Sequence, residues 1–248
     1  MRNVIMLTAK RTGSTFLMEA LNSHSNVTCY DEMFMRTRGK KEKRRGQYLY
    51  GYMKTKKNMN YKQYINWLFE NDGAISFRLM YPHLTKHKKV INVITADKIP
   101  VIHLTRKNYL AHYLSSQTKK TEKVNIDTGT IVKSMASLKS RELHHLKQLK
   151  GNQVPYIEID YDDLFGSVEG NKDNIKNYGA FNIKSDQITY INKQTSKKIC
   201  DFMEVDFKVL YSNVTKRNSW NIWDHIQNDK QVRKTIGKSD FSYLIKGI

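Results

Sequence analysis

The chain has 248 residues, enough for one large domain with a sizeable core, and 39% of them are hydrophobic, which excludes a disordered polypeptide. Its formal net charge of +20 predicts a polyanionic partner: nucleic acid, an anionic membrane, an acidic polysaccharide or a highly phosphorylated cofactor. A lysine-rich composition with solvated side chains explains the same excess, so charge alone does not choose among these classes.

The cysteines and the hydropathy of the chain bear on its compartment. Cys29 and Cys200 follow no metal-ligand spacing, which suits free thiols in a reducing compartment or one buried disulfide. No run approaches the ~18 apolar residues of a membrane helix. We therefore expect a soluble, cytoplasmic protein without a transmembrane segment, with a luminal domain that has lost its anchor as the alternative.

Strand-like and helix-like segments alternate along the first 160 residues. In chain order the pattern predicts strand 4–7, helix 16–21, strand 27–30, helix 61–70, strand 74–79, helix 84–96, strand 100–105, helix 109–117 capped by Asn108, helix 130–149 and strand 154–160. This alternation is typical of an α/β fold. We expect a P-loop-like parallel β-sheet flanked by helices.

Two segments fall outside this alternation. Residues 36–60 are strongly basic and predict a loop or insertion, either solvated or placed to hold an acidic acceptor. Residues 182–248 are rich in lysine, asparagine and aromatic residues, with less clear periodicity, and predict a less regular basic C-terminal part. No internal repeat is visible, so we expect a single domain over residues 1–248.

The turn at residues 8–15 connects the first strand to the first helix. Backbone N–H groups at a helix N-terminus bind phosphate, and Lys10 and Arg11 add positive charge. A Walker loop needs Gly-x-x-x-x-Gly-Lys-Ser/Thr, whereas here Ser14 follows Gly13. The turn therefore predicts a phosphate site, but not one for the β/γ phosphates and magnesium of a nucleoside triphosphate.

A second cationic site follows a later strand. Arg106 comes directly after the strand at 100–105, and its planar guanidinium suits a phosphate. Ser115, about two turns into the next helix, can add a hydrogen bond, with Ser116 as the alternative. The alternatives without a function are that Arg106 is a surface arginine and that Ser115 is a small residue in helix packing. Together, the two sites fit a ligand with two separate phosphate groups.

Five short motifs, in order along residues 3–165, resemble motifs of the sulfotransferase superfamily in its carbohydrate-type form. They are the 5′-phosphosulfate loop at 10–17 (Lys-Arg-Thr-Gly-Ser-Thr-Phe-Leu), the acidic segment at 31–34, the strand at 77–81 with Arg78 in place of the usual lysine, the 3′-phosphate segment at 103–108 with Ser115, and the Tyr-Asp-Asp-Leu segment at 161–164. A weaker match, Thr-Lys-Arg-Asn at 215–218, resembles a late basic segment.

The resemblance implies the sulfotransferase fold and an enzyme that uses 3′-phosphoadenosine-5′-phosphosulfate. The sulfuryl group would pass in line, without a metal, to a hydroxyl or amine of a carbohydrate or other small acceptor, neutral or anionic. Residues 182–248 would close over the cofactor. Sulfuryl transfer relies on positioning and charge stabilisation, which side-chain cations can supply.

The resemblance also implies roles for individual residues. The 5′-phosphosulfate and the leaving oxygen would be held by Lys10, Arg11, Thr12, Gly13, Ser14 and Thr15, with Lys10 and Arg11 acting in catalysis. The 3′-phosphate would be held by Arg106 and Ser115, with Lys216 and Arg217 closing over the nucleotide. Arg78 would stabilise the sulfuryl oxygens or hold an acidic acceptor.

An acceptor hydroxyl needs a general base. Glu32 is the first candidate, by its position after the second strand and by resemblance, and a surface or capping glutamate is the plain alternative. His83 is the second candidate, because cytosolic members of the superfamily use a histidine in a comparable region. We expect His112 and residues 144–145 to be surface histidines on helices, and the aspartates at 160–163 to be structural.

Two other functions stay open. The first is a small-molecule or nucleoside kinase with an atypical P-loop, disfavoured because the Gly-Lys-Ser/Thr sequence and a magnesium-binding aspartate after a strand are missing. The second is a nucleic-acid-binding protein that uses the +20 charge, although no known RNA- or DNA-binding signature is present. The sequence does not define the acceptor, the sulfated position or the oligomeric state.

Overall fold

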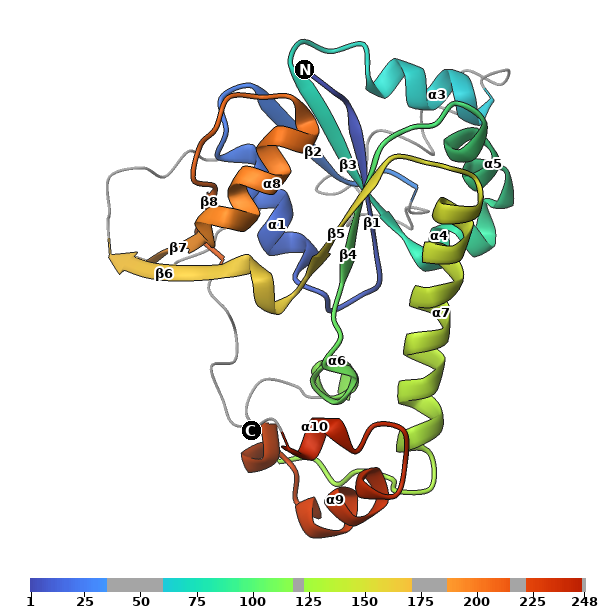
Figure 1. Cartoon of the computed structure of the whole chain (residues 1–248), viewed down its shortest axis with the longest axis vertical. Coiled ribbons are helices and arrows are strands. Elements are labelled where there is room, and N and C mark those ends of the chain that lie inside the picture. The colour runs from blue at the N-terminus through green and yellow to red at the C-terminus, as the bar shows by residue number, and fades with distance from the viewer. Residues whose placement is uncertain (35–59, 118–122, 171–186, 215–221, 247–248) are drawn as a thin grey trace, which may run out of the picture. The chain divides into compact units, whose positions relative to one another are not determined.

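The computed structural model describes residues 1–34, 60–117, 123–170, 187–214 and 222–246 (Figure 1). Residues 36–59 of the basic segment predicted at 36–60 lie outside the described residues, as do Lys216 and Arg217. The chain divides into two compact units, residues 1–105 with 147–215 and residues 106–146 with 216–248. The single domain expected over residues 1–248 stays a prediction. Within the described residues, no helix has the length and apolar character needed to cross a membrane.

Five parallel strands form the central sheet of the first unit, in the order β2-β3-β1-β4-β5. They are β1 (Val4–Thr8), β2 (Val27–Glu32), β3 (Ala74–Met80), β4 (Val101–Thr105) and β5 (Tyr156–Asp160). Every residue of β1, β3 and β4 is buried, as strands covered on both faces require. The sheet and its flanking helices confirm the predicted α/β fold.

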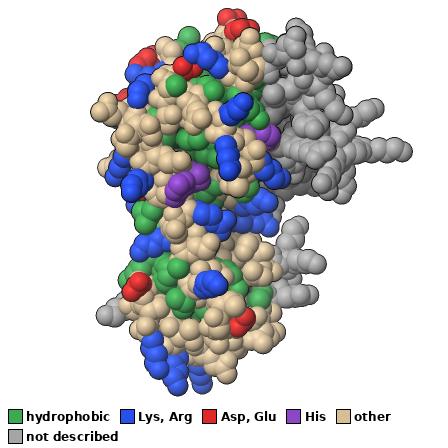
Figure 2. All heavy atoms as spheres, turned by 90° about the vertical axis from the view of Figure 1, so that its right-hand side faces the viewer, with side chains coloured by type: hydrophobic (Ala, Val, Ile, Leu, Met, Phe, Trp, Pro, Cys, Tyr) green, Lys and Arg blue, Asp and Glu red, His purple; other side chains and the backbone are tan. Residues whose placement is uncertain are grey.

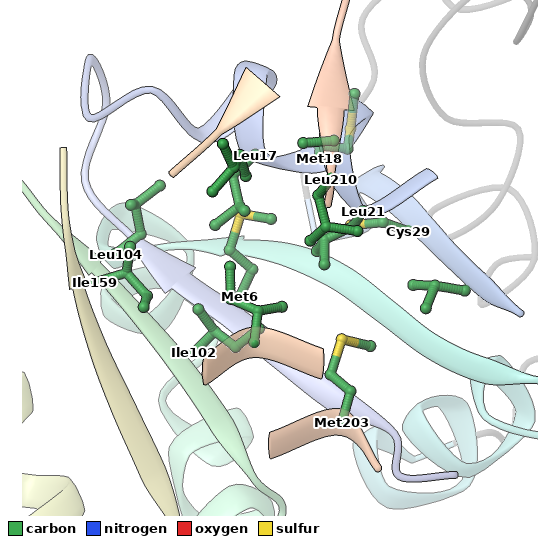
Figure 3. Packing of buried hydrophobic residues seen from close by; sticks show 14 of the residues in the cluster. Met6, Leu17, Met18, Leu21, Cys29, Ile102, Leu104, Ile159, Met203 and Leu210 are labelled. Atoms are coloured by element: carbon green, nitrogen blue, oxygen red, sulfur yellow. The ribbon is translucent and has the colours of Figure 1, made fainter. Parts of the chain in front are cut away.

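Helices cover both faces of this sheet (Figure 1). One face carries α1 (Ser14–Asn22) and α8 (Lys193–Met203), and the other carries α3 (Tyr61–Leu68), α4 (Tyr81–Lys86), α5 (Lys88–Ala96) and the last turn of α7 (Ile131–Gly151). Because side chains alternate along a strand, Met6 points into the first layer and Ile5 into the second. Figure 3 shows Met6 packed among Leu17 of α1 and Met203 of α8.

The structure differs from the sequence prediction in two places of the first unit. The helix expected over 84–96 is two helices, α4 and α5, because His87 has non-helical dihedral angles of φ −119° and ψ 60°. In addition, an antiparallel sheet of β6 (Phe165–Gly170), β7 (Gln187–Ile191) and β8 (Tyr211–Ser212) follows β5 and was not predicted. A short 3₁₀ helix, η2 (Asp162–Leu164), precedes it.

Both cysteines are buried free thiols, which agrees with the first of the two expected states. Burial raises the pKa of the Cys29 thiol to about 12. The thiol of Cys29 is therefore protonated at neutral pH, and it acts as an apolar group within the core.

The second unit has its own core. It contains α6 (Tyr109–Gln117), most of α7, the 3₁₀ helix η3 (Ile222–His225), α9 (Asp229–Gly237) and α10 (Tyr243–Lys246), packed around Leu110, Ile131, Met135, Val232 and Ile236. The predicted cap of α6 is confirmed, since Asn108 Oδ1 accepts a hydrogen bond from the N–H of Ala111 at 3.0 Å.

The surface position expected for three histidines of this unit is correct only for His144. His112 and His145 are buried, with 5% and 8% of their surface exposed. His112 lies on α6 and His145 on α7, and each of these helices has a buried side. The two helices are joined by a hydrogen bond from the hydroxyl of Tyr109 on α6 to the buried Glu142 on α7 at 3.2 Å. Because the sequence of α7 is largely polar, its pattern does not indicate which residues are buried.

Candidate functional site

The turn between β1 and α1 lies at the carboxyl edge of the sheet, where open α/β sheets bind ligands. Thr12 is buried, donates a hydrogen bond to the carbonyl of Ala9 at 3.0 Å and shares another with the hydroxyl of Thr8. Its side chain therefore closes the turn on itself. Lys10 and Arg11 are exposed, and Arg11 adopts the left-handed region with φ 66°.

Gly13 is the N-cap of α1, and its position does not accommodate a side chain. Its φ is +81°, and a Cβ atom added there would lie 2.9 Å from Cδ2 of Tyr161 and 3.2 Å from Cδ1 of Leu164. The first intrahelical bond joins the N–H of Leu17 to the carbonyl of Gly13. The N–H groups that precede it point out of the helix end, where an anion can bind.

Arg78 connects this helix end to the end of β2. Its guanidinium is buried, and Nη1 donates to Ser14 Oγ at 3.2 Å and to Thr15 Oγ1 at 2.9 Å. Nη2 donates to Glu32 Oε1 at 3.1 Å and to Asp31 Oδ1. The candidate base is thus joined to the first turn of α1 through one side chain.

His83 lies next to the candidate base. Its Nε2 is 3.6 Å from Glu32 Oε2, and its Nδ1 accepts a hydrogen bond from the N–H of Met80 at 3.2 Å. A backbone N–H can only donate, so the proton of the neutral imidazole lies on Nε2, the nitrogen nearer Glu32. The structure therefore brings Glu32 and His83, the two candidates for the base, close together. Glu32 accepts a hydrogen bond from a side chain, that of Arg78, and His83 accepts one from the backbone.

His83 is neutral at physiological pH. The pKa of His83 is lowered to about 4, mainly by burial and then, in decreasing order of importance, by the charges of His87, Lys86, Arg78 and Lys10. The positive charge of Lys10 thus acts on the same site as Arg78. The carboxylates of Asp31 and Glu32 lie within an otherwise cationic surrounding.

The lowered pKa of His83 makes stability depend on pH. Between its ordinary value of 6.5 and about 4, the unfolded chain binds a proton that the folded chain does not, so stability is lost as pH falls. We expect wild type to lose on the order of 2–3 kcal/mol more unfolding free energy between pH 7 and 4.5 than His83→Asn, which retains an acceptor for Met80. Urea unfolding at both pH values measures this difference.

A matched control uses an exposed histidine. His144→Asn should lose as much stability as wild type over the same pH range, because His144 is exposed on α7. Equal pH dependence in wild type and His83→Asn would contradict the assignment of His83 as a neutral, buried group.

The residues proposed for the 3′-phosphate belong to the second unit. Arg106 directly follows the last residue of β4 and is half-buried. Ser115 is half-buried on α6, whereas Ser116 is exposed and donates its hydroxyl to the carbonyl of Tyr113 at 2.6 Å. Ser116 is therefore engaged in its own helix, which favours Ser115 of the two serines. The 3′-phosphate role of Arg106 and Ser115 stays a prediction.

Asp160, the last residue of β5, has a structural role, as expected. Asp160 Oδ2 accepts from the hydroxyl of Thr105 at 3.2 Å, and its Oδ1 accepts from the N–H of Asp162 at 3.1 Å. These bonds fix the turn that carries Tyr161. The ring of Tyr161 in turn packs against Gly13, a contact that sequence reasoning missed although both residues lie in motifs it had singled out.

Positive charge is spread over the surface of the described residues. Figure 2 shows lysine and arginine side chains at many separate places on one face, with few acidic side chains among them. This distribution agrees with a general excess of solvated cations as well as with a polyanionic partner.

The chain is similar to known proteins at the level of structure. No family model matches the chain, and no curated protein does. Among solved structures, the chain is similar to a sulfotransferase from Alicyclobacillus acidocaldarius, with 10% sequence identity, a TM-score of 0.43 and 99% of each chain covered. At this identity and TM-score, the similarity establishes neither a family nor an activity.

Proposed function

We propose that the chain is a sulfotransferase that uses 3′-phosphoadenosine-5′-phosphosulfate to modify a hydroxyl or amine of a carbohydrate or other small acceptor. One observation carries the proposal. A carboxylate, Glu32, and the N-terminus of α1 are joined by the same guanidinium, that of Arg78. This arrangement puts a proton acceptor next to an anion-binding helix end, as transfer of an anionic group to a hydroxyl requires.

The residues at the β1–α1 turn fit the 5′-phosphosulfate of this cofactor. The position that a Cβ of Gly13 would take is filled by Tyr161 and Leu164, so the anion would meet the backbone N–H groups at the N-terminus of α1. Lys10 and Arg11 would neutralise the charge. Arg106, Ser115 and the late basic pair Lys216 and Arg217 would hold the remainder of the nucleotide. When bound, the cofactor supplies an activated sulfuryl group.

Glu32 is the base that the geometry favours. Its Oε1 accepts from Arg78, which orients the carboxylate, while 21% of its side chain is exposed and can be reached by an acceptor. His83 has Nδ1 bonded to Met80 and a proton on Nε2, so its neutral ring has no vacant nitrogen. We therefore assign proton abstraction to Glu32.

Metal independence is part of the proposal. Within the described ranges, no group of three or more His, Cys, Asp or Glu side chains could hold a metal ion. The cations of the site would stabilise the transferred charge instead. The kinase alternative would need magnesium ligands beside the β1–α1 turn.

Thermal unfolding in the presence of nucleotides tests the proposal. We expect 3′,5′-adenosine bisphosphate at about 100 times its Kd to raise Tm by roughly 5–10 °C, and ATP with magnesium to raise it little. Arg106→Ala should lose most of this stabilisation because the 3′-phosphate loses its partner. Arg141→Ala, an exposed arginine of the same unit, should keep it.

The other functions predict different outcomes. Stronger stabilisation by ATP with magnesium would favour the kinase. Equal stabilisation by heparin, RNA and the bisphosphate, abolished by moderate salt, would favour nucleic-acid binding. Once the bisphosphate is shown to bind, radiolabelled donor with a panel of sugars, oligosaccharides and small alcohols would identify the acceptor.

A further inference from the structure

We infer that Arg78 is a positioning residue, which holds the carboxylate of Glu32 in a fixed relation to the first turn of α1. The inference rests on the proposed function and adds a role to it. The sequence alone suggests a different task for Arg78, namely contact with the sulfuryl group or with an acidic acceptor. The hydrogen bonds of the guanidinium favour positioning.

The order of the strands puts Arg78 where it can connect the two parts of the site. Strand β3 lies between β2 and β1, and Arg78 is in register with Glu32 on one side and Met6 on the other. Side chains in register on neighbouring strands share a face. Met6 faces the layer that contains α1, so Arg78 reaches the start of that helix.

The Nη donors of the Arg78 guanidinium are engaged within the chain, whereas Nε is buried and has no hydrogen-bond partner among the described residues. Each Nη nitrogen carries two protons, and Nη1 bonds Ser14 and Thr15 while Nη2 bonds Asp31 and Glu32. All four Nη protons therefore have acceptors that belong to the protein. With 6% of its surface exposed, Arg78 is also poorly placed to meet an acceptor molecule.

Only a guanidinium, with its two Nη nitrogens, can bond the hydroxyls of α1 and the carboxylates of β2 at the same time. A lysine keeps the positive charge but has a single nitrogen, which can approach either the hydroxyls of α1 or the carboxylates of β2. Hydroxyl groups that accept from Arg78 also keep their own protons for an incoming anion. Arg78 thus organises the helix end and orients Glu32 without touching the reacting atoms.

Arg78→Lys tests the inference. With the acceptor identified by the screen, we expect kcat to fall at least tenfold, while KM for the acceptor and Kd for 3′,5′-adenosine bisphosphate change less than threefold. In urea unfolding, Arg78→Lys and Thr15→Val should be non-additive, because both remove the same hydrogen bond. Lys62→Arg, a matched exchange at an exposed position, should change none of these values.

Each other outcome overturns a specific statement. A tenfold higher KM with unchanged kcat would assign Arg78 to acceptor binding, and a lower unfolding midpoint with unchanged kcat would make it purely structural. Either result overturns the inference while the proposed function stands. A wild-type chain that neither binds the bisphosphate nor transfers a sulfuryl group overturns the proposed function, and the inference falls with it.

Discussion

Glu32→Gln is expected to lower turnover by a factor of roughly 10² to 10⁴, which is the usual contribution of general base catalysis. Glutamine has the shape of glutamate, and its amide oxygen can still accept from Arg78, so the site should keep its geometry. An amide cannot take a proton from the acceptor hydroxyl. Steady-state kinetics with labelled donor measures the loss.

The affinity for nucleotide separates a catalytic effect from a binding effect. Glu32→Gln should bind 3′,5′-adenosine bisphosphate as wild type does, since no cofactor contact is assigned to Glu32. Glu70→Gln is the matched control, because Glu70 is exposed and precedes the amino end of β3, at the opposite edge of the sheet. Normal turnover by Glu32→Gln would show that another group is the base.

Gly13→Ala is expected to destabilise the protein and to weaken nucleotide binding at least tenfold. An L-residue at φ +81° costs roughly 1–2 kcal/mol, and the new Cβ would lie 2.9 Å from the ring of Tyr161. The turn must therefore shift, and the N–H groups of α1 move with it. Urea unfolding and calorimetry with 3′,5′-adenosine bisphosphate measure the two effects.

Two comparisons separate the causes of this loss. Gly151→Ala at the end of α7 should not destabilise, since its Cβ would have nothing within 4 Å. The double variant Gly13→Ala, Tyr161→Ala removes the steric contact but keeps the backbone strain. It should recover part of the stability that Gly13→Ala loses relative to Tyr161→Ala. Wild-type affinity in Gly13→Ala would contradict the assignment of the turn.

The sequence predicts the parallel sheet well because buried parallel strands are almost entirely apolar. The strand after residue 100 contains Val101, Ile102 and Leu104, all fully buried, and such runs need no partner to be recognised. Of the antiparallel strands, β8 cannot be predicted because its two residues are too few to show an alternating pattern.

The candidate residues could be found from sequence, but their contacts could not. Glu32, Arg78 and His83 each lie at or near a strand end, which indicates a shared edge. Their pairing depends on the order β2-β3-β1, which sets residues distant in sequence side by side. Asp31 also accepts a hydrogen bond from Arg78, and nothing in the sequence around Asp31 indicates this contact.

The packing of Tyr161 on Gly13 also sets when the β1–α1 turn can take its final shape during synthesis. The turn and its helix leave the ribosome well before β5, the last strand of the parallel sheet, whereas the ring against which Gly13 packs follows β5. Contacts between such distant residues form late, because a long loop must close before they are made. A nascent chain that ends before β5 therefore carries every residue of the β1–α1 turn but lacks the surface that gives the turn its shape.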